Sequence, residues 1–156
     1  NYQARNFMRS MKKGDQAFFY HSNTNPPGIV GLMEIIETDL IDPFEIDESS
    51  KYFDKKSNKD TPRWDCVKTK YICEFKNMLT LKELSKTYTS DELTLVRKGN
   101  RLSIMPIKEN IALEILKKIK KNFFGFFFVF IIFSCIIPAI VMIIPCCNNW
   151  NVFFHV

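Results

Sequence analysis

The chain has 156 residues, enough for one domain plus an extension and too few for two substantial hydrophobic cores. Its formal net charge is +5, an excess that is compatible with binding a polyanion and is also common in proteins that bind none. All 22 Lys and Arg residues and all 17 Asp and Glu residues precede Asn122, so the average composition describes two unlike segments, 1–121 and 122–156.

The first part of the chain predicts a helix followed by a hairpin. Apolar residues recur at helical spacing over residues 4–11, and the Gly-Asp pair at 14–15 ends that pattern in a turn. The aromatic run 16–21 and the apolar run 29–37 are typical of strands. Residues 23–28, which contain Pro-Pro-Gly, form a tight polar connection between them.

An acidic excursion follows the hairpin. Residues 39–48 carry five acids and no basic residue, and the segment continues to Pro62 with little periodicity. Because the acids lack the spacing and the glycine of a calcium loop, we interpret them as part of a solvated surface loop rather than as a cation site.

The rest of the charged segment predicts further short strands and one longer helix. Residues 65–75 alternate as a half-exposed strand does. One face of this strand would carry Val67, Thr69, Tyr71, Cys73 and Phe75. Residues 79–84 suggest a helical turn, residues 93–97 and 102–105 further strands, and residues 109–121 an amphipathic helix. Many short strands with few helices favour an α+β fold built as a small mixed β-barrel with short flanking helices.

The cysteines give no sign of a metal site or a disulfide framework, because they include no CxxC pair and no histidine at ligand spacing. They are Cys66, Cys73, Cys135, Cys146 and Cys147. This usage indicates a reducing compartment, in which Cys66 and Cys73 are small buried hydrophobic residues. We expect no metal and no cofactor.

The uncharged segment 122–156 has two interpretations. Residues 123–147 are apolar over a length that can cross a bilayer, and they follow four lysines within residues 117–121, which predicts a C-terminal transmembrane helix. A tail so rich in Phe and Ile can equally be translated non-coding sequence from an AT-rich gene.

Four separated motifs carry a family resemblance. They are the opening NYQARNFMRSMKKGD, the pair FFYHS and PPGIVGLMEI, then PRWDCV, and finally RLSIMPI. In this order they resemble the EVE domain of the PUA-like superfamily. The similarity is closest to the thymocyte nuclear protein group and spans residue 1 to about residue 119, which predicts a domain over residues 1–121. In that family a Val-Arg pair and an upstream strand with a Lys-Ser/Thr-Glu-Pro motif precede the opening run. We therefore expect this chain to lack one N-terminal strand.

The resemblance implies recognition rather than catalysis, namely a module that accepts a modified nucleobase of DNA, or of RNA, into an aromatic and polar pocket. A base taken out of its stack needs a flat apolar surface and a few hydrogen-bonding groups for its edge. The candidate base-binding residues are Asn1, Tyr2, Tyr20, His21, Ser22 and Trp64. The candidates for contact with the phosphate backbone are Arg5, Arg9, Lys12 and Lys13.

Several of these candidates also have a structural interpretation. Tyr20 suits the core as well as a pocket, His21 can bond the backbone of the following loop, and Trp64 can close one end of a barrel. The basic residues of a short helix are usually solvated.

Two other functions compete with base recognition. The first is a membrane-anchored interaction protein whose soluble head is not catalytic. The second is an enzyme, and it is disfavoured because the sequence holds no nucleophile elbow and no Gly-rich phosphate loop. We expect a monomeric, non-catalytic protein in the nucleus, with a membrane as the alternative location if residues 123–147 span one.

Overall fold

The structure, a computed structural model, describes residues 2–121, 140–143 and 153–155 of the chain. Three α-helices, one turn of 3₁₀-helix and six strands form within these ranges. In chain order they are α1 (Tyr2–Ser10), β1 (Gln16–His21), β2 (Gly28–Ile41), β3 (Asp65–Thr80), α2 (Leu81–Thr87), η1 (Thr94–Val96), β4 (Ile104–Ile107), α3 (Glu109–Lys121), β5 (Ile140–Ile143) and β6 (Phe153–His155).

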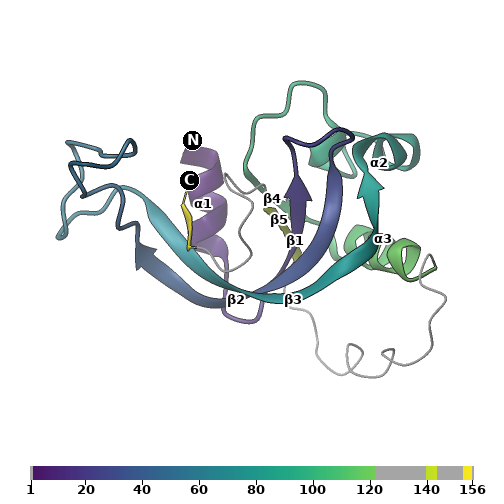
Figure 1. Ribbon diagram of the computed structural model, residues 1–156, viewed down its shortest axis with the longest axis horizontal. Helices are drawn as coiled ribbons and strands as arrows, with labels where there is room; N and C mark the ends of the chain where they lie inside the picture. Colours follow the sequence, from purple (N-terminus) through teal and green to yellow (C-terminus); the bar gives the residue numbers. More distant parts are fainter. Residues whose placement is uncertain (1, 122–139, 144–152, 156) are drawn as a thin grey trace.

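The six strands form one mixed sheet with the order β4-β5-β1-β2-β3-β6. Strands β1 and β5 run parallel, and the other neighbouring pairs run antiparallel. Strands β2 and β3 form a long curved ribbon, and α2 and α3 lie at the end of the molecule opposite the excursion between these strands (Figure 1). The expected α+β class with short flanking helices is confirmed. In the described ranges β4 and β6 are the two edges of a curved sheet, and no strand pairing there closes it into a barrel.

Strand β1 is buried on both faces and divides the core in two. Phe18 and Phe19 are both fully buried. Phe18 lies in one cluster with Leu84 of α2 and Ile115 of α3, whereas Phe19 lies in a second cluster with Met8 of α1. Successive side chains of a strand point to opposite faces, which explains why two adjacent phenylalanines serve separate clusters. Helices therefore cover both faces of the sheet at β1.

The hairpin between β1 and β2 packs closely against the junction of β3 and α2. The backbone N–H of Leu81 donates a hydrogen bond to the carbonyl of Pro27 at 2.9 Å. A Cβ atom at Gly28 would lie only 2.6 Å from the backbone oxygen of Leu79. Glycine is required at this position because the two backbones approach too closely for any side chain.

Most of the elements expected from local pattern are confirmed, although several ends are shifted. Strand β1 and helix α3 have the predicted bounds, 16–21 and 109–121. The predicted strand at 93–97 is wrong, because this segment forms η1, in which the N–H of Val96 bonds to the carbonyl of Leu93. Leu93 and Leu95 are both buried, so a tight turn here produces the alternating burial that is typical of a strand.

The regular alternation expected along residues 65–75 is interrupted by a β-bulge. Leu32 pairs with Cys73 and Met33 pairs with Tyr71, so Ile72 is an extra residue on β3. Tyr71, expected on the same face as Val67, is exposed, and Ile72 packs against the core.

The apolar tail differs from the predicted transmembrane helix where it is described. Residues 140–143 form β5, which pairs with β1 on one side and β4 on the other, so a helix does not run through to residue 147. The run of β-branched residues suits a strand, and two neighbouring strands satisfy its backbone groups. Among the described residues, no helix has the length and apolarity needed to cross a membrane. The other residues of the predicted helix, 123–139 and 144–147, lie outside the described ranges.

Candidate functional site

A stacked aromatic pair joins α1 to the beginning of β3. Tyr2 lies in the first turn of α1 and Trp64 directly precedes β3, and their ring centroids are 5.6 Å apart with an interplanar angle of 12°. Arg5 lies one helical turn after Tyr2, with its guanidinium carbon 4.7 Å from the Tyr2 centroid and 6.0 Å from the Trp64 centroid. Tyr2 is 54% exposed, so this cluster presents an aromatic surface to solvent.

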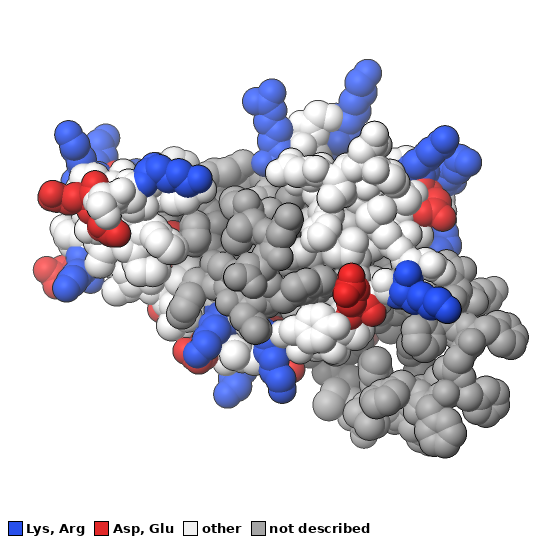
Figure 2. Space-filling model, viewed as in Figure 1, with Lys and Arg blue, Asp and Glu red and all other residues white. Residues whose placement is uncertain are grey.

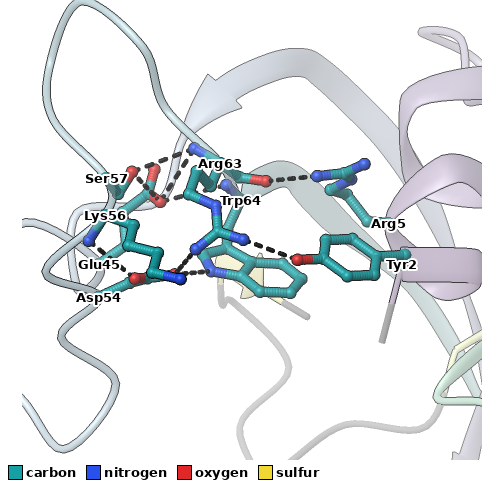
Figure 3. Close-up of polar contacts among 8 residues, drawn as sticks. All are labelled: Tyr2, Arg5, Glu45, Asp54, Lys56, Ser57, Arg63 and Trp64. Atoms are coloured by element: carbon teal, nitrogen blue, oxygen red, sulfur yellow. Dashed lines mark hydrogen bonds and ion pairs between the residues drawn. The ribbon is translucent and has the colours of Figure 1, made fainter.

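A buried carboxylate positions the backbone that carries Trp64. Glu45 lies in the excursion between β2 and β3 and is only 1% exposed. Its Oε2 accepts hydrogen bonds from the backbone N–H of Arg63 at 3.2 Å, from the backbone N–H of Trp64 at 3.1 Å and from the hydroxyl of Ser57 (Figure 3). Charge-assisted hydrogen bonds of this kind are stronger than neutral ones. Glu45 therefore holds the excursion in one conformation from inside it, by bonding to Trp64, which follows it by 19 residues in the chain.

Asp54 and Arg63 fix the side chains of the aromatic pair. Asp54 Oδ2 accepts the indole N–H of Trp64 at 3.1 Å and lies 2.9 Å from Nη1 of Arg63. Nη2 of Arg63 donates to the Tyr2 hydroxyl at 2.6 Å, and Nη1 of Arg5 donates to the Arg63 carbonyl at 3.1 Å (Figure 3).

Hydrogen bonds keep Asp54 ionised. The backbone N–H of Lys56 and then the indole N–H of Trp64 hold the pKa of Asp54 below its ordinary value of 3.8. At neutral pH its negative charge therefore faces the Arg63 guanidinium.

This arrangement can bind a flat aromatic ligand. The exposed ring of Tyr2 offers a stacking surface, and the guanidinium of Arg5 lies against the same ring pair. Aromatic and guanidinium planes are the groups on which proteins stack nucleobases. The interaction of Arg63 with the Tyr2 hydroxyl restricts rotation of the Tyr2 side chain, which lowers the entropy cost of stacking a ligand on it.

The structure brings the base-binding candidates Tyr2 and Trp64 together with Arg5 but places Tyr20, His21 and Ser22 elsewhere. Tyr20 is 4% exposed and packs in the cluster of Phe18, and burial raises the pKa of its phenol. His21 is half-buried at the end of β1, with its ring edge-on to Phe19 at 5.2 Å.

The remaining two base-binding candidates are Ser22 and Asn1. Ser22 is exposed in the bend after β1. Asn1 lies outside the described residues. The binding roles of Tyr20, His21, Ser22 and Asn1 stay predictions.

The four candidates for phosphate contact divide into two pairs. Arg5 is half-buried within the aromatic cluster, and Arg9 forms an ion pair with Asp65. Lys12 and Lys13 are exposed in the turn after α1. Figure 2 shows Lys and Arg side chains projecting singly or in small groups along the margins of the face in view. Among the described residues, neither lysine side chain forms an ion pair like that of Arg9.

Sequence analysis missed three residues that build the site: Glu45, Asp54 and Arg63. Arg63 stands inside the PRWDCV motif, which was the available signal. Glu45 and Asp54 belong to the excursion that was interpreted as solvated. The loop instead uses Glu45 as a buried acceptor, and its pairing with the PRWDCV segment cannot be read from spacing along the chain.

Comparisons with known proteins agree on one family. Thymocyte nuclear protein 1 of Mus musculus is 40% identical over 118 residues, which is 70% of this chain and 51% of that protein. A crystal structure of a Pseudomonas syringae protein has a TM-score of 0.71 and 40% identity, covering 76% of this chain and 80% of the other. A crystal structure of human THYN1 in complex with DNA containing 5-methylcytosine has a TM-score of 0.69 and 34% identity, covering 77% and 74%.

The chain spans about half the length of the curated relatives that it matches. Residues 1–118 match the family model described as the EVE domain, so the Tyr2–Trp64 site and strands β1 to β4 lie within the matched region. The chain belongs to the EVE domain family.

Proposed function

We propose that this protein is a non-catalytic binding module that recognises a modified base in DNA. The observation that carries the proposal is the exposed Tyr2–Trp64 stack, held by Arg5 and by the Arg63–Asp54 pair. The crystal structure of human THYN1 with 5-methylcytosine DNA supports it, because that protein is 34% identical to this chain.

Binding at this site divides into two physical contributions. A base extruded from the duplex loses stacking worth about a few kcal/mol, and stacking on an aromatic side chain returns about 1–3 kcal/mol. Contacts of Lys12 and Lys13 with phosphates add affinity that falls as salt rises. Selectivity for the modification arises at the aromatic cluster, so it should persist at salt concentrations that weaken total binding.

The proposal includes a nuclear location and a monomeric state. The name thymocyte nuclear protein 1 of the curated relatives supports the location. RNA is the alternative nucleic acid, because stacking on aromatic side chains does not itself distinguish the two sugars.

The test measures binding of the full chain to fluorescent duplexes that are identical except for one 5-methylcytosine. We expect tighter binding to the methylated duplex, and Tyr2→Leu should weaken that binding about tenfold through lost stacking. Tyr71→Leu is the matched control, since Tyr71 is an exposed tyrosine on β3 outside the cluster. Equal affinity for both duplexes, or an unchanged affinity in Tyr2→Leu, would refute the proposal. An unlabelled RNA competitor of the same sequence tests the alternative nucleic acid.

A further inference from the structure

A second feature of the excursion lies beside the aromatic cluster and shares Trp64 with it. It is a surface cavity of about 300 Å³. Three carboxylates and three aromatic side chains line it: Asp42, Glu45, Asp54, Tyr52, Phe53 and Trp64. The combination of acids with aromatic rings is the chemistry by which proteins bind organic cations.

One of the lining carboxylates has an oxygen without a partner. Glu45 is 1% exposed, and its Oε2 accepts three hydrogen bonds, but its Oε1 accepts none from the described residues. A buried acceptor of this kind costs free energy unless a donor satisfies it. Glu45 is one of the residues that line the cavity, and an N–H donor that reached its Oε1 from there would satisfy this acceptor.

The protein already places one of its own cations at this cavity. Lys51 also lines it, with its ammonium nitrogen 4.8 Å from the centroid of the Tyr52 ring. An ammonium ion over an aromatic face is stabilised by the ring quadrupole. Because the Lys51 side chain is long and flexible, an external ammonium can compete with it for the same surface.

Two other ligand classes fit less well. Within the described ranges, no group of three or more His, Cys, Asp or Glu side chains is placed to hold a metal ion. Phosphate groups would meet the charges of Asp42, Glu45 and Asp54, which repel anions. The cavity thus differs in charge from the surface that contacts a nucleic-acid backbone.

We propose that this cavity binds an alkylammonium ion that keeps at least one N–H group. The apolar stem would lie against the rings of Tyr52 and Trp64, and the N–H would donate to Glu45 Oε1. The ion can be a small amine or the side chain of a lysine on another protein, because both present the same chemistry.

The test follows the indole N–H resonance of Trp64 in the full chain while n-butylammonium is added, with n-butyltrimethylammonium and n-butanol as comparisons. We expect a saturable shift with n-butylammonium, binding of the quaternary ion at least about threefold weaker because it has no N–H to donate, and no saturable shift with the alcohol. A saturable response to n-butanol equal to that of n-butylammonium, or no response to n-butylammonium, would overturn the proposal.

Two variants separate the contributions of charge and ring. Glu45→Gln keeps an acceptor for the loop but removes the charge, and Tyr52→Leu removes an aromatic ring from the lining; each should weaken n-butylammonium binding about threefold or more. Lys51→Gln should strengthen it by about threefold, since the internal competitor is gone. Glu48→Gln is the control, because Glu48 is an exposed acid of the same excursion that does not line the cavity.

The source of the cation is tested with spermidine and an acetylated, amidated lysine tripeptide. Tighter binding of the tripeptide identifies a protein side chain as the ligand, and tighter binding of spermidine identifies a free amine. These measurements use no DNA, so their result is independent of the test for base recognition. If Tyr52→Leu and Lys51→Gln both leave n-butylammonium binding unchanged, the cavity is not the site.

Discussion

The guanidinium of Arg63 connects the Tyr2 hydroxyl, 61 residues away in the chain, to the carboxylate of Asp54. Nη2 lies 2.6 Å from the Tyr2 oxygen and Nη1 lies 2.9 Å from Asp54 Oδ2. One planar side chain therefore holds α1 against the excursion between β2 and β3. The ring of Tyr2 is thus held by this connection as well as by its stacking on Trp64.

Arg63→Lys should reduce base recognition while leaving the net charge unchanged. A lysine presents one ammonium and cannot reproduce the fixed fork that contacts Tyr2 and Asp54 together. We expect about fivefold weaker binding to methylated DNA, or ~1 kcal/mol, with an unchanged salt dependence. Fluorescence anisotropy at two salt concentrations measures both quantities. Arg97→Lys, at an exposed arginine, serves as the control. Wild-type affinity in Arg63→Lys would mean that the connection does not support the site.

Replacing Lys12 and Lys13 by glutamine should change salt dependence rather than selectivity. Each neutralised phosphate contributes about 0.9 to the slope of log affinity against log salt, so the double variant should lower the slope by about 2. The ratio of affinities for methylated and unmethylated DNA should stay the same. The pair Lys82→Gln and Lys86→Gln on α2 is the control, since both residues are exposed lysines on another element. An unchanged slope in the Lys12 and Lys13 variant would exclude them from phosphate contact.

The local environment of Trp64 should respond to acid through Asp54. Because the folded state holds the pKa of Asp54 below 3.8, the stabilising contribution of its contacts is present above that value and is lost as pH falls through the lower folded pKa. The indole N–H resonance of Trp64 should hold its position from pH 7 to about 4.5 and shift only below 3.8. Asp54→Asn should abolish this titration. A midpoint above 4.5 in the wild-type protein would contradict the assignment to Asp54.

The elements that sequence analysis predicts correctly are those that local pattern determines. Helix α3 follows from the amphipathic pattern of residues 109–121, in which Ile111 and Ile115 are both buried, and β1 follows from its aromatic run. The segment at 93–97 shows where this fails, because buried residues two apart suit a strand and a tight helical turn equally well.

The site could be predicted only in part for a different reason. Tyr2 and Trp64 lie in family motifs, so the resemblance identifies them. Glu45 becomes important only through backbone N–H groups 18 and 19 residues away, after the excursion has folded back on itself. An acid in a polar loop gives no local sign of such burial, since most acids in loops remain solvated.

Gly28→Ala should destabilise the fold although the substitution is small. The added Cβ would lie 2.6 Å from the Leu79 carbonyl oxygen, and backbone atoms cannot move aside as a flexible side chain can. We expect a loss of about 1–3 kcal/mol in the free energy of unfolding, measured by urea denaturation. Asn23→Ala, at an exposed position of the same hairpin, should change stability by less than about 0.5 kcal/mol. Equal stability of the Gly28→Ala and wild-type proteins would show that the two backbones are farther apart.

The role of residues 140–143 is decided by comparing two substitutions at Val141. This residue pairs with Ala17 of β1 on one side and Pro106 of β4 on the other, so β5 is an interior strand. Val141→Pro removes a backbone donor from the sheet, whereas Val141→Thr keeps the N–H and the β-branched shape but lowers the apolarity.

If β5 completes the sheet, Val141→Pro should lower the free energy of unfolding by about 1–3 kcal/mol and accelerate hydrogen exchange at the amides of β1, while Val141→Thr should have a much smaller effect. If the segment acts instead as part of a membrane helix, the soluble domain should keep its stability in both variants. In that case Val141→Thr should be the variant that weakens membrane association. Unfolding measurements on the two variants and fractionation of the expressed protein thus separate the interpretations. The sheet interpretation predicts a change in stability, and the membrane interpretation predicts a change in membrane association instead.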